Sequence, residues 1–375
     1  MLTEIHLSSF KCFDTLDLAL APLTLLTGVN GGGKSSIMQA LVLLSQTFDQ
    51  QEWGRALLLV GPELALGNAA DVLNEASARR RLAVGIAADG QRVKWTFRAE
   101  DRQALSLDLE QVEVDGLPAP LGSATRWLMP PEYVEKSPVV HAVRKLSWIT
   151  AERTGPRELL PLRAPDGHAR VGAHGELAAG LLHWRIDDEV RPVLRVPDEP
   201  PTLFHQVRAR MRSFFPGCDL QVSPIDRVSA VSLQLRSDSR SNFQRPQNVG
   251  FGLTQLFPII VSLLAARVGD VVLIENPEVH LHPSAQQRIG TLLGVVAASG
   301  VQVILESHSD HVLNGVRLAV KQKMLSAADV RVHFFGRRPG LGSKPESPVM
   351  DGDGRLDGWP EGFFDQLDFA LAELM

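Results

Sequence analysis

The stretch GVNGGGKSS, Gly28 to Ser36, decides which fold this chain is expected to adopt. It follows the apolar segment LTLLTGV, and it opens the segment KSSIMQALVLLSQTF, whose apolar residues recur at helical spacing. The predicted order is therefore strand, glycine-rich loop and helix. The stretch matches the pattern G-x-x-x-x-G-K-[ST], which binds phosphate groups in this context. A flexible glycine linker is the alternative, but a linker does not place Gly-Lys-Ser between a buried strand and an apolar-faced helix.

The loop predicts contacts with a nucleotide and a metal ion. Glycines permit positive φ and a close approach of the backbone, so N–H groups at the helix start can point at phosphates. Lys34 is expected beside the β- and γ-phosphates, and the Ser35 hydroxyl is expected to ligate Mg²⁺. The residues expected to bind the nucleotide are Asn30, Gly31, Gly32, Gly33, Lys34, Ser35 and Ser36.

Composition places the chain among globular proteins. It has 375 residues, of which 44% are hydrophobic and 22% charged, so it is long enough for more than one structural unit. The net charge of −5 does not exclude nucleic acid, because local basic clusters bind phosphates whatever the total charge. Two such clusters are ARRR, residues 78–81, and RARMR, residues 208–212. We favour the interpretation that both clusters lie on solvent-exposed helix faces.

Cysteine usage and hydropathy predict a cytoplasmic protein. Cys12 and Cys218 are far apart in the sequence and form no CxxC pair, so the sequence supports neither a disulfide framework nor a thiolate zinc site. The first ten residues lack the apolar core of a signal peptide. No apolar run reaches the length of a membrane span, so we expect no membrane partner.

The hydropathy pattern divides the chain into four predicted regions and indicates an α/β fold. Residues 1–150 contain the phosphate loop and, at about 80–118, an antiparallel β lobe that alternates apolar and polar residues between Asp-Gly turns. Residues 151–245 predict an α+β insertion. Residues 246–337 alternate strands with helices, as in a mostly parallel, helix-covered sheet. Residues 338–375 are turn-rich and then amphipathic.

Two local expectations follow from the same pattern. Residues 3–27 are read as two strands, TEIHLSSFKCF and LTLLTGV, which the alternating stretch DTLDLAL separates. No heptad repeat is present, so a long coiled-coil arm is not expected.

Three motifs in the second half of the chain place polar groups at strand ends or helix starts. DVVLIENPE carries Glu275 after four apolar residues, where a carboxylate can ligate Mg²⁺ at the edge of a parallel sheet. VQVILESHSDH ends another strand near His308, which could contact a γ-phosphate or position water. NVGFGLTQ starts an apolar helix and could bind a phosphate there. An ordinary glycine turn that caps the helix is the alternative for NVGFGLTQ.

In combination, these motifs resemble the ABC-type ATPase heads of the RecF, SMC and overcoming-lysogenisation-defect (OLD) superfamily. More narrowly, FKCF, LGNAADVLN, TAERTGPR, VGAHGE, VGFGLTQLFPI, IENPEVHLHP, ESHSDHVLNG and WPEGFFDQ are similar to motifs in a group of prokaryotic predicted ATPases of that superfamily. The resemblance implies a homodimer in which ATP lies between the phosphate loop of one protomer and the signature of the other. It also implies that Gly250, Gly252 and Gln255 complete the partner's site and that His308 is the switch histidine.

The chain departs from the superfamily pattern in two ways. The expected absence of a coiled-coil arm separates it from long-armed SMC proteins. The short stretch after the switch region also leads us to expect no metal-binding nuclease domain of the kind that many OLD proteins carry.

Asn276 occupies the position at which the wider superfamily carries the carboxylate that polarises the attacking water. An amide can orient water but cannot accept a proton. Loss of one positioned acid or base lowers a rate by roughly 10²–10⁴, so slow ATP hydrolysis is predicted. Glu278 either replaces the missing base or caps the next helix, while Glu306 and Asp310 are weaker substitutes. The predicted catalytic residues are Lys34, Glu275, Asn276, Glu278 and His308.

Three further sets of side chains have two readings each. The histidines near the motifs could form a transition-metal cluster, or they could belong to the turns that open the following helices. The arginines of AERTGPR could clamp phosphate or DNA, or they could pair with neighbouring glutamates. Gln46 could stand near the magnesium ion, although its position inside a helix argues against this. The residues concerned are His280, His282, His308 and His311, Arg153 and Arg157 with Glu152 and Glu158, and Gln46.

The sequence therefore predicts a Mg²⁺-dependent, ATP-binding head that dimerises around ATP and hydrolyses it slowly. The resemblance implies a role in DNA repair or in defence against phage or plasmids, with DNA as a candidate ligand and a separate nuclease or toxin as effector. The competing class is an ATP-gated regulatory switch that controls a protein partner without binding DNA. A third class, a metal-dependent hydrolase, would require the histidine cluster.

Overall fold

The computed structural model describes residues 1–75, 80–164, 170–336, 345–360 and 373. The chain divides into two compact units. The first unit comprises residues 1–146, 330–351 and 356–375, and the second comprises residues 147–329 and 352–355. Among the described residues, no helix combines the length and the apolar character needed to cross a bilayer.

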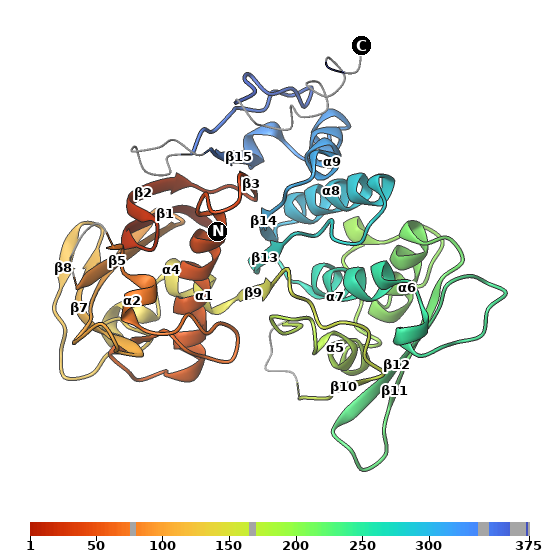
Figure 1. The fold of residues 1–375 in the computed structure, drawn as a ribbon, viewed down its shortest axis with the longest axis horizontal. Helices are drawn as coiled ribbons and strands as arrows, with labels where there is room; N and C mark the ends of the chain where they lie inside the picture. The colour runs from red at the N-terminus through yellow and green to blue at the C-terminus, as the bar shows by residue number, and fades with distance from the viewer. Residues whose placement is uncertain (76–79, 165–169, 337–344, 361–372, 374–375) are drawn as a thin grey trace. The chain divides into compact units, whose positions relative to one another are not determined.

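The largest sheet belongs to the first unit and is antiparallel throughout (Figure 1). Its strands follow the order β2-β1-β5-β6-β7-β4, with β8 paired to β7. The predicted antiparallel β lobe is confirmed, because two Asp-Gly turns with positive φ join β5 to β6 and β7 to β8. The strands are β1 (Leu2–Phe10), β2 (Phe13–Ala19), β4 (Ala56–Leu58), β5 (Arg81–Ala88), β6 (Gln91–Arg98), β7 (Ser106–Val114) and β8 (Leu117–Ala119).

The reading of residues 3–27 as two strands is wrong, because the chain forms three. Phe10 and Phe13 pair across a tight reversal, in which Lys11 has a φ of 49°. This left-handed conformation ends β1 and starts β2. The alternating stretch DTLDLAL is therefore a strand of its own, with one face buried and the other exposed.

A parallel strand pair in the first unit holds the phosphate loop. β3 (Leu23–Gly28) pairs in parallel with β15 (Val330–Phe335), and the strand residues Leu23 to Thr27 are all buried. The loop leads from β3 into α1 (Lys34–Gln50), which contacts α4 (Pro138–Arg144). The remaining short helices are α2 (Ala69–Val72) and α3 (Pro131–Val134).

The second unit contains a second parallel pair, flanked by long helices. β13 (Val271–Glu275) and β14 (Gln302–Glu306) run in parallel with every side chain buried. Continuous apolar strands of this kind are typical of sheets that are covered on both faces. The helices are α7 (Phe251–Ala265), α8 (Pro283–Ala298) and α9 (Asp310–Lys321), and a short strand, β9 (Leu146–Ile149), enters this unit.

Close packing of α8 against α9 depends on small residues. A Cβ atom on Gly315 would lie 2.1 Å from the carbonyl oxygen of Gln287, and one on Gly290 would lie 2.2 Å from that of Val312. Neither glycine can be replaced without moving a helix backbone. The backbones of α8 and α9 are therefore in close contact at these two positions.

A smaller α+β region completes the second unit. Three antiparallel strands follow the order β10-β12-β11, beside α5 and α6. Their bounds are β10 (Leu159–Pro161), β11 (Asp219–Pro224), β12 (Ala230–Arg236), α5 (Ala178–Trp184) and α6 (Leu203–Phe214). The predicted fold class, a mixed α/β fold with parallel and antiparallel sheets, is confirmed.

Candidate functional site

The phosphate loop requires glycine at two positions for steric reasons. Gly28 has a φ of 127°, and a Cβ atom there would lie 2.3 Å from the carbonyl oxygen of Phe335. Gly33 has a φ of 99° immediately before α1, and its Cβ would lie 2.5 Å from the ring of Phe13 and 2.7 Å from the sulfur of Cys12. The loop conformation therefore depends on both glycines.

Lys34 lies across the loop that it follows. Its side chain is buried, and its Nζ donates to the carbonyl oxygens of Gly28 at 3.1 Å and Val29 at 2.9 Å. Asn30 and Gly31 are exposed at the loop tip. An anion that entered the loop would replace carbonyl oxygens as the acceptors of the Lys34 ammonium group.

Glu275 ends β13 as a buried carboxylate held by the neighbouring segment. Its Oε2 accepts hydrogen bonds from the Thr150 hydroxyl and from the Ala151 N–H, each at 3.1 Å. Burial raises the pKa of the Glu275 carboxyl above its ordinary value, and the nearby Glu306 carboxylate raises it further. A cation bound beside Glu275 would favour its ionised form and so offset both effects.

Thr150 is a site residue that the sequence reasoning missed. It directly follows the buried strand LSWI, in the segment that leads to AERTGPR. The signal available in the sequence was a hydroxyl directly after a fully buried strand, where polar side chains gather in parallel sheets.

Asn276 has a left-handed backbone, with a φ of 44°. Its N–H donates to the Glu306 carbonyl oxygen at 2.8 Å, so the turn is anchored to the end of β14. Asparagine and aspartate adopt this conformation more readily than other residues with a side chain. The amide at this position therefore has a local conformational explanation.

Glu278 binds the loop that carries the predicted switch histidine. Its Oε2 accepts from the Ser307 hydroxyl and its Oε1 accepts from the His308 N–H, both at 2.9 Å. Both carboxylate oxygens are thus engaged in holding the β14–α9 connection. This geometry favours a role in positioning His308 over the role of general base.

The loop places His308 at the surface and fixes the start of α9. The His308 side chain is 36% exposed, and its Nε2 lies 3.8 Å from Oε1 of the buried Glu306. Ser309 caps α9 by accepting from the Val312 N–H, while its hydroxyl donates to Gln286 on α8. His308 is thus presented to solvent by a loop whose backbone is well anchored.

The glycine-led start of α7 is partly open. Gly250 is the exposed N-cap, and a Cβ atom on Gly252 would lie 2.8 Å from the His280 carbonyl oxygen. Phe251 is 44% exposed and lies edge-to-face on the His280 ring, with ring centroids 4.7 Å apart. Gln255 is buried one turn further along the helix, so Gly250 and Phe251 form the accessible part.

Arg153 lies between the start of α7 and the turn that follows β13. It is 6% exposed, and it donates to Gln255 Oε1 at 3.1 Å and to the carbonyl oxygens of Glu275 at 2.9 Å and Asn276 at 2.8 Å. Neither sequence-based reading of Arg153 holds, because its bonds go to carbonyl and carboxamide oxygens inside the protein. Glu158, one of the predicted partners, pairs with Arg245 instead.

The remaining candidates take structural positions. Both ends of the Gln46 carboxamide bind the backbone of Leu58 and Leu64, so the reading of Gln46 as a magnesium-proximal residue does not hold. His282 caps α8 by accepting from the Ser284 N–H. Within the described residues, no group of three or more His, Cys, Asp or Glu side chains could hold a metal ion, which argues against the histidine cluster.

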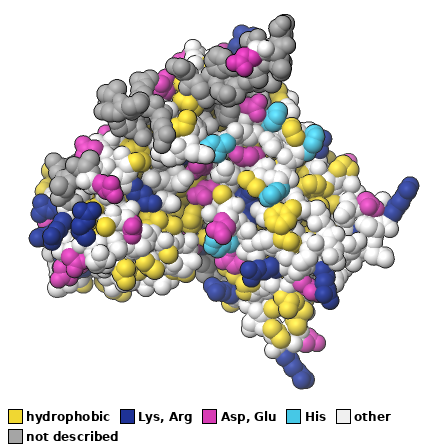
Figure 2. All heavy atoms as spheres, viewed as in Figure 1, with side chains coloured by type: hydrophobic (Ala, Val, Ile, Leu, Met, Phe, Trp, Pro, Cys, Tyr) yellow, Lys and Arg dark blue, Asp and Glu magenta, His cyan; other side chains and the backbone are white. Residues whose placement is uncertain are grey.

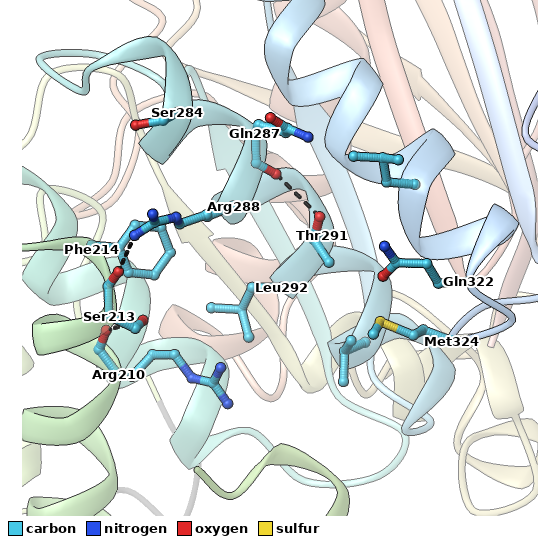
Figure 3. Close-up of a pocket in the computed structure, with 12 residues that line it drawn as sticks. Arg210, Ser213, Phe214, Ser284, Gln287, Arg288, Thr291, Leu292, Gln322 and Met324 are labelled. Carbon is cyan, nitrogen blue, oxygen red and sulfur yellow. Dashed lines mark hydrogen bonds between the residues drawn. The ribbon is translucent and has the colours of Figure 1, made fainter.

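The basic cluster RARMR lies on α6 and is largely committed to contacts inside the second unit. Arg208 forms a bidentate pair with the buried Asp219, with both N–O distances 2.6 Å, and Arg212 approaches the same carboxylate. Arg210 points toward a groove of about 580 Å³ between α6, α8 and α9 (Figure 3). Of the cluster ARRR, Ala78 and Arg79 lie outside the described residues.

Comparison with known proteins places the chain in an ATPase family. A family model described as "AAA domain, putative AbiEii toxin, Type IV TA system" matches residues 23–314, which is more than half of the chain. A second model, described only as a protein of unknown function, matches residues 325–374. The predicted resemblance to RecF/SMC/OLD-like ABC-type ATPases is confirmed.

Two solved structures share the fold at low sequence identity, and one further relative matches a short segment of the sequence. An SMC head bound to the C-terminal winged-helix domain of ScpA matches with a TM-score of 0.53 and 13% identity, over 93% of this chain and 98% of that one. An SMC head from Pyrococcus furiosus, with an extended coiled coil and bound to the C-terminal domain of ScpA, matches with a TM-score of 0.52 and 11% identity, over 100% and 99%. An OLD nuclease from Thermus scotoductus is 41% identical over 44 residues, which are 12% of this chain and 8% of that relative.

Proposed function

Because this chain belongs to the AAA-domain family whose model covers residues 23–314, we propose that it binds ATP with Mg²⁺, dimerises around the nucleotide and hydrolyses it slowly. The observation that carries the proposal is the phosphate loop, in which Gly28 and Gly33 are sterically required and Lys34 lies across the loop. A loop of this shape at a helix start is suited to bind phosphate groups.

Two oxygen-bearing side chains are the proposed Mg²⁺ ligands. Ser35 follows the loop lysine, and Glu275 ends β13, so the pair supplies a hydroxyl and a carboxylate. Hard oxygen ligands of this type suit Mg²⁺, which would supply positive charge to stabilise the phosphate groups. The raised pKa of Glu275 fits this role. Burial destabilises the ionised carboxylate, so a nearby cation would stabilise that form.

The chain's own groups have distinct proposed roles. Lys34 would leave the carbonyl oxygens of Gly28 and Val29 and donate to the β- and γ-phosphates. Asn276 and His308 would orient the attacking water and contact the γ-phosphate. Glu278 would keep His308 in place through its two hydrogen bonds to the loop. With an amide where a base is expected, turnover is proposed to be slow.

The dimer is supported by the geometry at the start of α7. Gly250 and Phe251 leave this helix start exposed, and backbone N–H groups there attract anions. We propose that the start of α7 faces the nucleotide of a second copy, with Gly250 and Gly252 at the contact and the buried Gln255 behind them. SMC heads share the fold at TM-scores just above 0.5, which is consistent with this arrangement.

The substitution Lys34→Ala tests the proposal directly. We expect ATP affinity to fall about tenfold to a hundredfold, because charge-assisted hydrogen bonds contribute about 1.5–3 kcal/mol each. Titration calorimetry with ATP and Mg²⁺ measures the affinity, and Lys136→Ala, at an exposed lysine of the same unit, is the matched control. Equal ATP affinity in wild type and Lys34→Ala would refute the phosphate-site assignment.

The proposed role is DNA repair or defence against phage or plasmids, with DNA as ligand and a separate nuclease or toxin as effector. The type IV toxin–antitoxin system in the family description is compatible with defence. The alternative is an ATP-gated switch that acts on a protein partner alone. On the face drawn in Figure 2, Lys and Arg side chains of the described residues lie in small groups among acidic ones, which gives the alternative some weight.

ATP turnover with and without DNA separates these two roles. We expect duplex, single-stranded or broken DNA to stimulate phosphate release by wild-type protein and to leave Lys34→Ala inactive. Stimulation by one DNA form would also identify the preferred ligand. Turnover that no DNA form changes would favour the protein-directed switch.

A further inference from the structure

The guanidinium of Arg153 joins two elements that the proposed function assigns to different nucleotides. One edge donates through Nε to Gln255 Oε1 near the start of α7, and the other donates to the carbonyl oxygens of Glu275 and Asn276 at the end of β13. A fourth, longer bond of 3.4 Å runs to the Thr150 carbonyl oxygen. A single rigid plane thus spans α7 and the turn after β13, whose labels are marked in Figure 1.

The charge of Arg153 is buried without a direct counter-ion. Arg153 forms no ion pair with a described carboxylate, whereas Arg208 is held bidentately by Asp219. Burial lowers the pKa of Arg153 to about 10, an effect that the more distant Glu278 and Glu275 carboxylates oppose. The side chain therefore stays charged at neutral pH, although burial of an unpaired charge is unfavourable.

Because a buried, unpaired charge is unfavourable, its presence here requires a property of arginine that a neutral side chain lacks. Arginine presents five N–H donors in a fixed planar fork, so one side chain can hold three acceptors at defined angles. Lysine keeps the charge but has only a single donor atom. An apolar side chain of similar volume would fill the space but would leave these three acceptors without a donor.

We infer that Arg153 is a positioning residue that couples the start of α7 to the Glu275–Asn276 turn. The inference rests on the proposed function, in which α7 of one protomer faces the nucleotide bound to its partner, while Glu275 serves the protomer's own nucleotide. A shift of Gln255 on nucleotide engagement would rotate the guanidinium and move both carbonyl oxygens that it holds. Each protomer would thereby transmit the occupancy of one composite site to the chemistry of the other.

The substitution Arg153→Lys tests this coupling, with Arg185→Lys as the matched control. Arg185 is also a poorly exposed arginine of the second unit, and it donates to the carbonyl oxygen of Ala265 at the opposite end of α7. We expect Arg153→Lys to lower kcat about tenfold or more, because small misplacements of catalytic groups have effects of this size. The Kd for ATP should change by less than about twofold, since no phosphate contact is removed.

Cooperativity supplies a readout that a merely structural role would not move. In the Arg153→Lys protein the Hill coefficient for ATP turnover should fall toward 1, while Arg185→Lys should keep the wild-type value. ATP-dependent dimerisation is measured in parallel by sedimentation. Equal kcat and equal cooperativity in the two variants would overturn the coupling role of Arg153.

A double-mutant cycle tests whether Arg153 acts through Gln255. Gln255→Leu should lower kcat in the same way as Arg153→Lys, and the double variant should be no slower than either single one, because both changes break one pathway. Additive effects on kcat would contradict the pathway and overturn the inference. Wild-type protein that binds ATP but stays monomeric would refute the dimer proposal and the coupling together, whereas a cooperative wild type with a cooperative Arg153→Lys variant refutes the coupling alone.

Discussion

At the scale of single residues, backbone conformation explains the amide that follows the Glu275 carboxylate. Asn276 has a φ of 44°, and a residue with an ordinary side chain loses about 1–2 kcal/mol in this left-handed region. Asparagine and aspartate both tolerate it, whereas glutamate does not share this advantage. Asn276 thus permits the left-handed turn. In the proposed function, its amide cannot accept a proton from the attacking water.

Asn276→Asp should therefore increase ATP turnover. Aspartate keeps the backbone preference and adds a carboxylate, so kcat is expected to rise about tenfold or more if the missing base limits the rate. The control is Asn276→Gly, which also accepts positive φ but offers no side chain, and it should turn over no faster than wild type. Phosphate release under saturating ATP is the measurement. A slow Asn276→Asp variant with unchanged ATP affinity would show that another step limits the rate.

At the scale of elements, the connection from β14 to α9 is held from two sides. Glu278 binds the Ser307 hydroxyl and the His308 N–H, while Ser309 reaches Gln286 on α8. Gly290 on α8 and Gly315 on α9 allow the two helices to approach closely enough for that contact. The loop is therefore a rigid mount for an exposed histidine.

Glu278→Gln is expected to act on the loop and not on proton transfer. Because glutamine keeps one acceptor oxygen and loses the other, we expect the free energy of unfolding to fall by about 1 kcal/mol. Turnover should change by less than about tenfold, whereas loss of a general base would lower it by about 10²–10⁴. Urea denaturation and steady-state ATPase assays provide the two values. A rate loss of the larger size in a stably folded variant would restore Glu278 as the base.

At the scale of the whole molecule, His333 ties three distant parts of the first unit together. Its Nε2 lies 2.8 Å from the Ala19 carbonyl oxygen, so this nitrogen carries the proton, and its Nδ1 accepts from the Ser347 hydroxyl at 2.7 Å. Burial lowers the pKa of His333 from 6.5 to about 4. The His333 imidazole therefore stabilises the fold only at pH values at which it is neutral.

Acid should weaken the first unit through this histidine. A histidine whose folded pKa lies below its unfolded pKa contributes stability that is present above pH 6.5 and is lost as the pH falls toward 4. The effect amounts to at most about 3 kcal/mol. Between pH 6.5 and 4, Tm of wild type should fall more steeply than Tm of His333→Gln, with His141→Gln, at an exposed histidine, as control. Parallel pH profiles for wild type and His333→Gln would contradict this.

By itself, the sequence determined the phosphate loop, the antiparallel lobe and the alternation of strands and helices in the second half, because all three depend on local patterns. Glycine spacing reports backbone geometry within a few residues, and hydrophobic period reports which face is buried. Both signals are complete within a single segment. The break at Lys11 escaped prediction, because nothing in the local alternation marks a left-handed residue between two β patterns.

Only the tertiary structure decided what the polar residues of the second unit do. Arg153 reaches Gln255 and Glu275, which are 102 and 122 residues away, and Glu278 reaches His308 across 30 residues. Partners at such separations leave no periodic trace in a single sequence, since any buried arginine or glutamate looks alike along the chain. The packing of α7, β13 and β14 determines these hydrogen-bond partners, because a buried polar group must bind the acceptors and donors that the folded backbone brings to it.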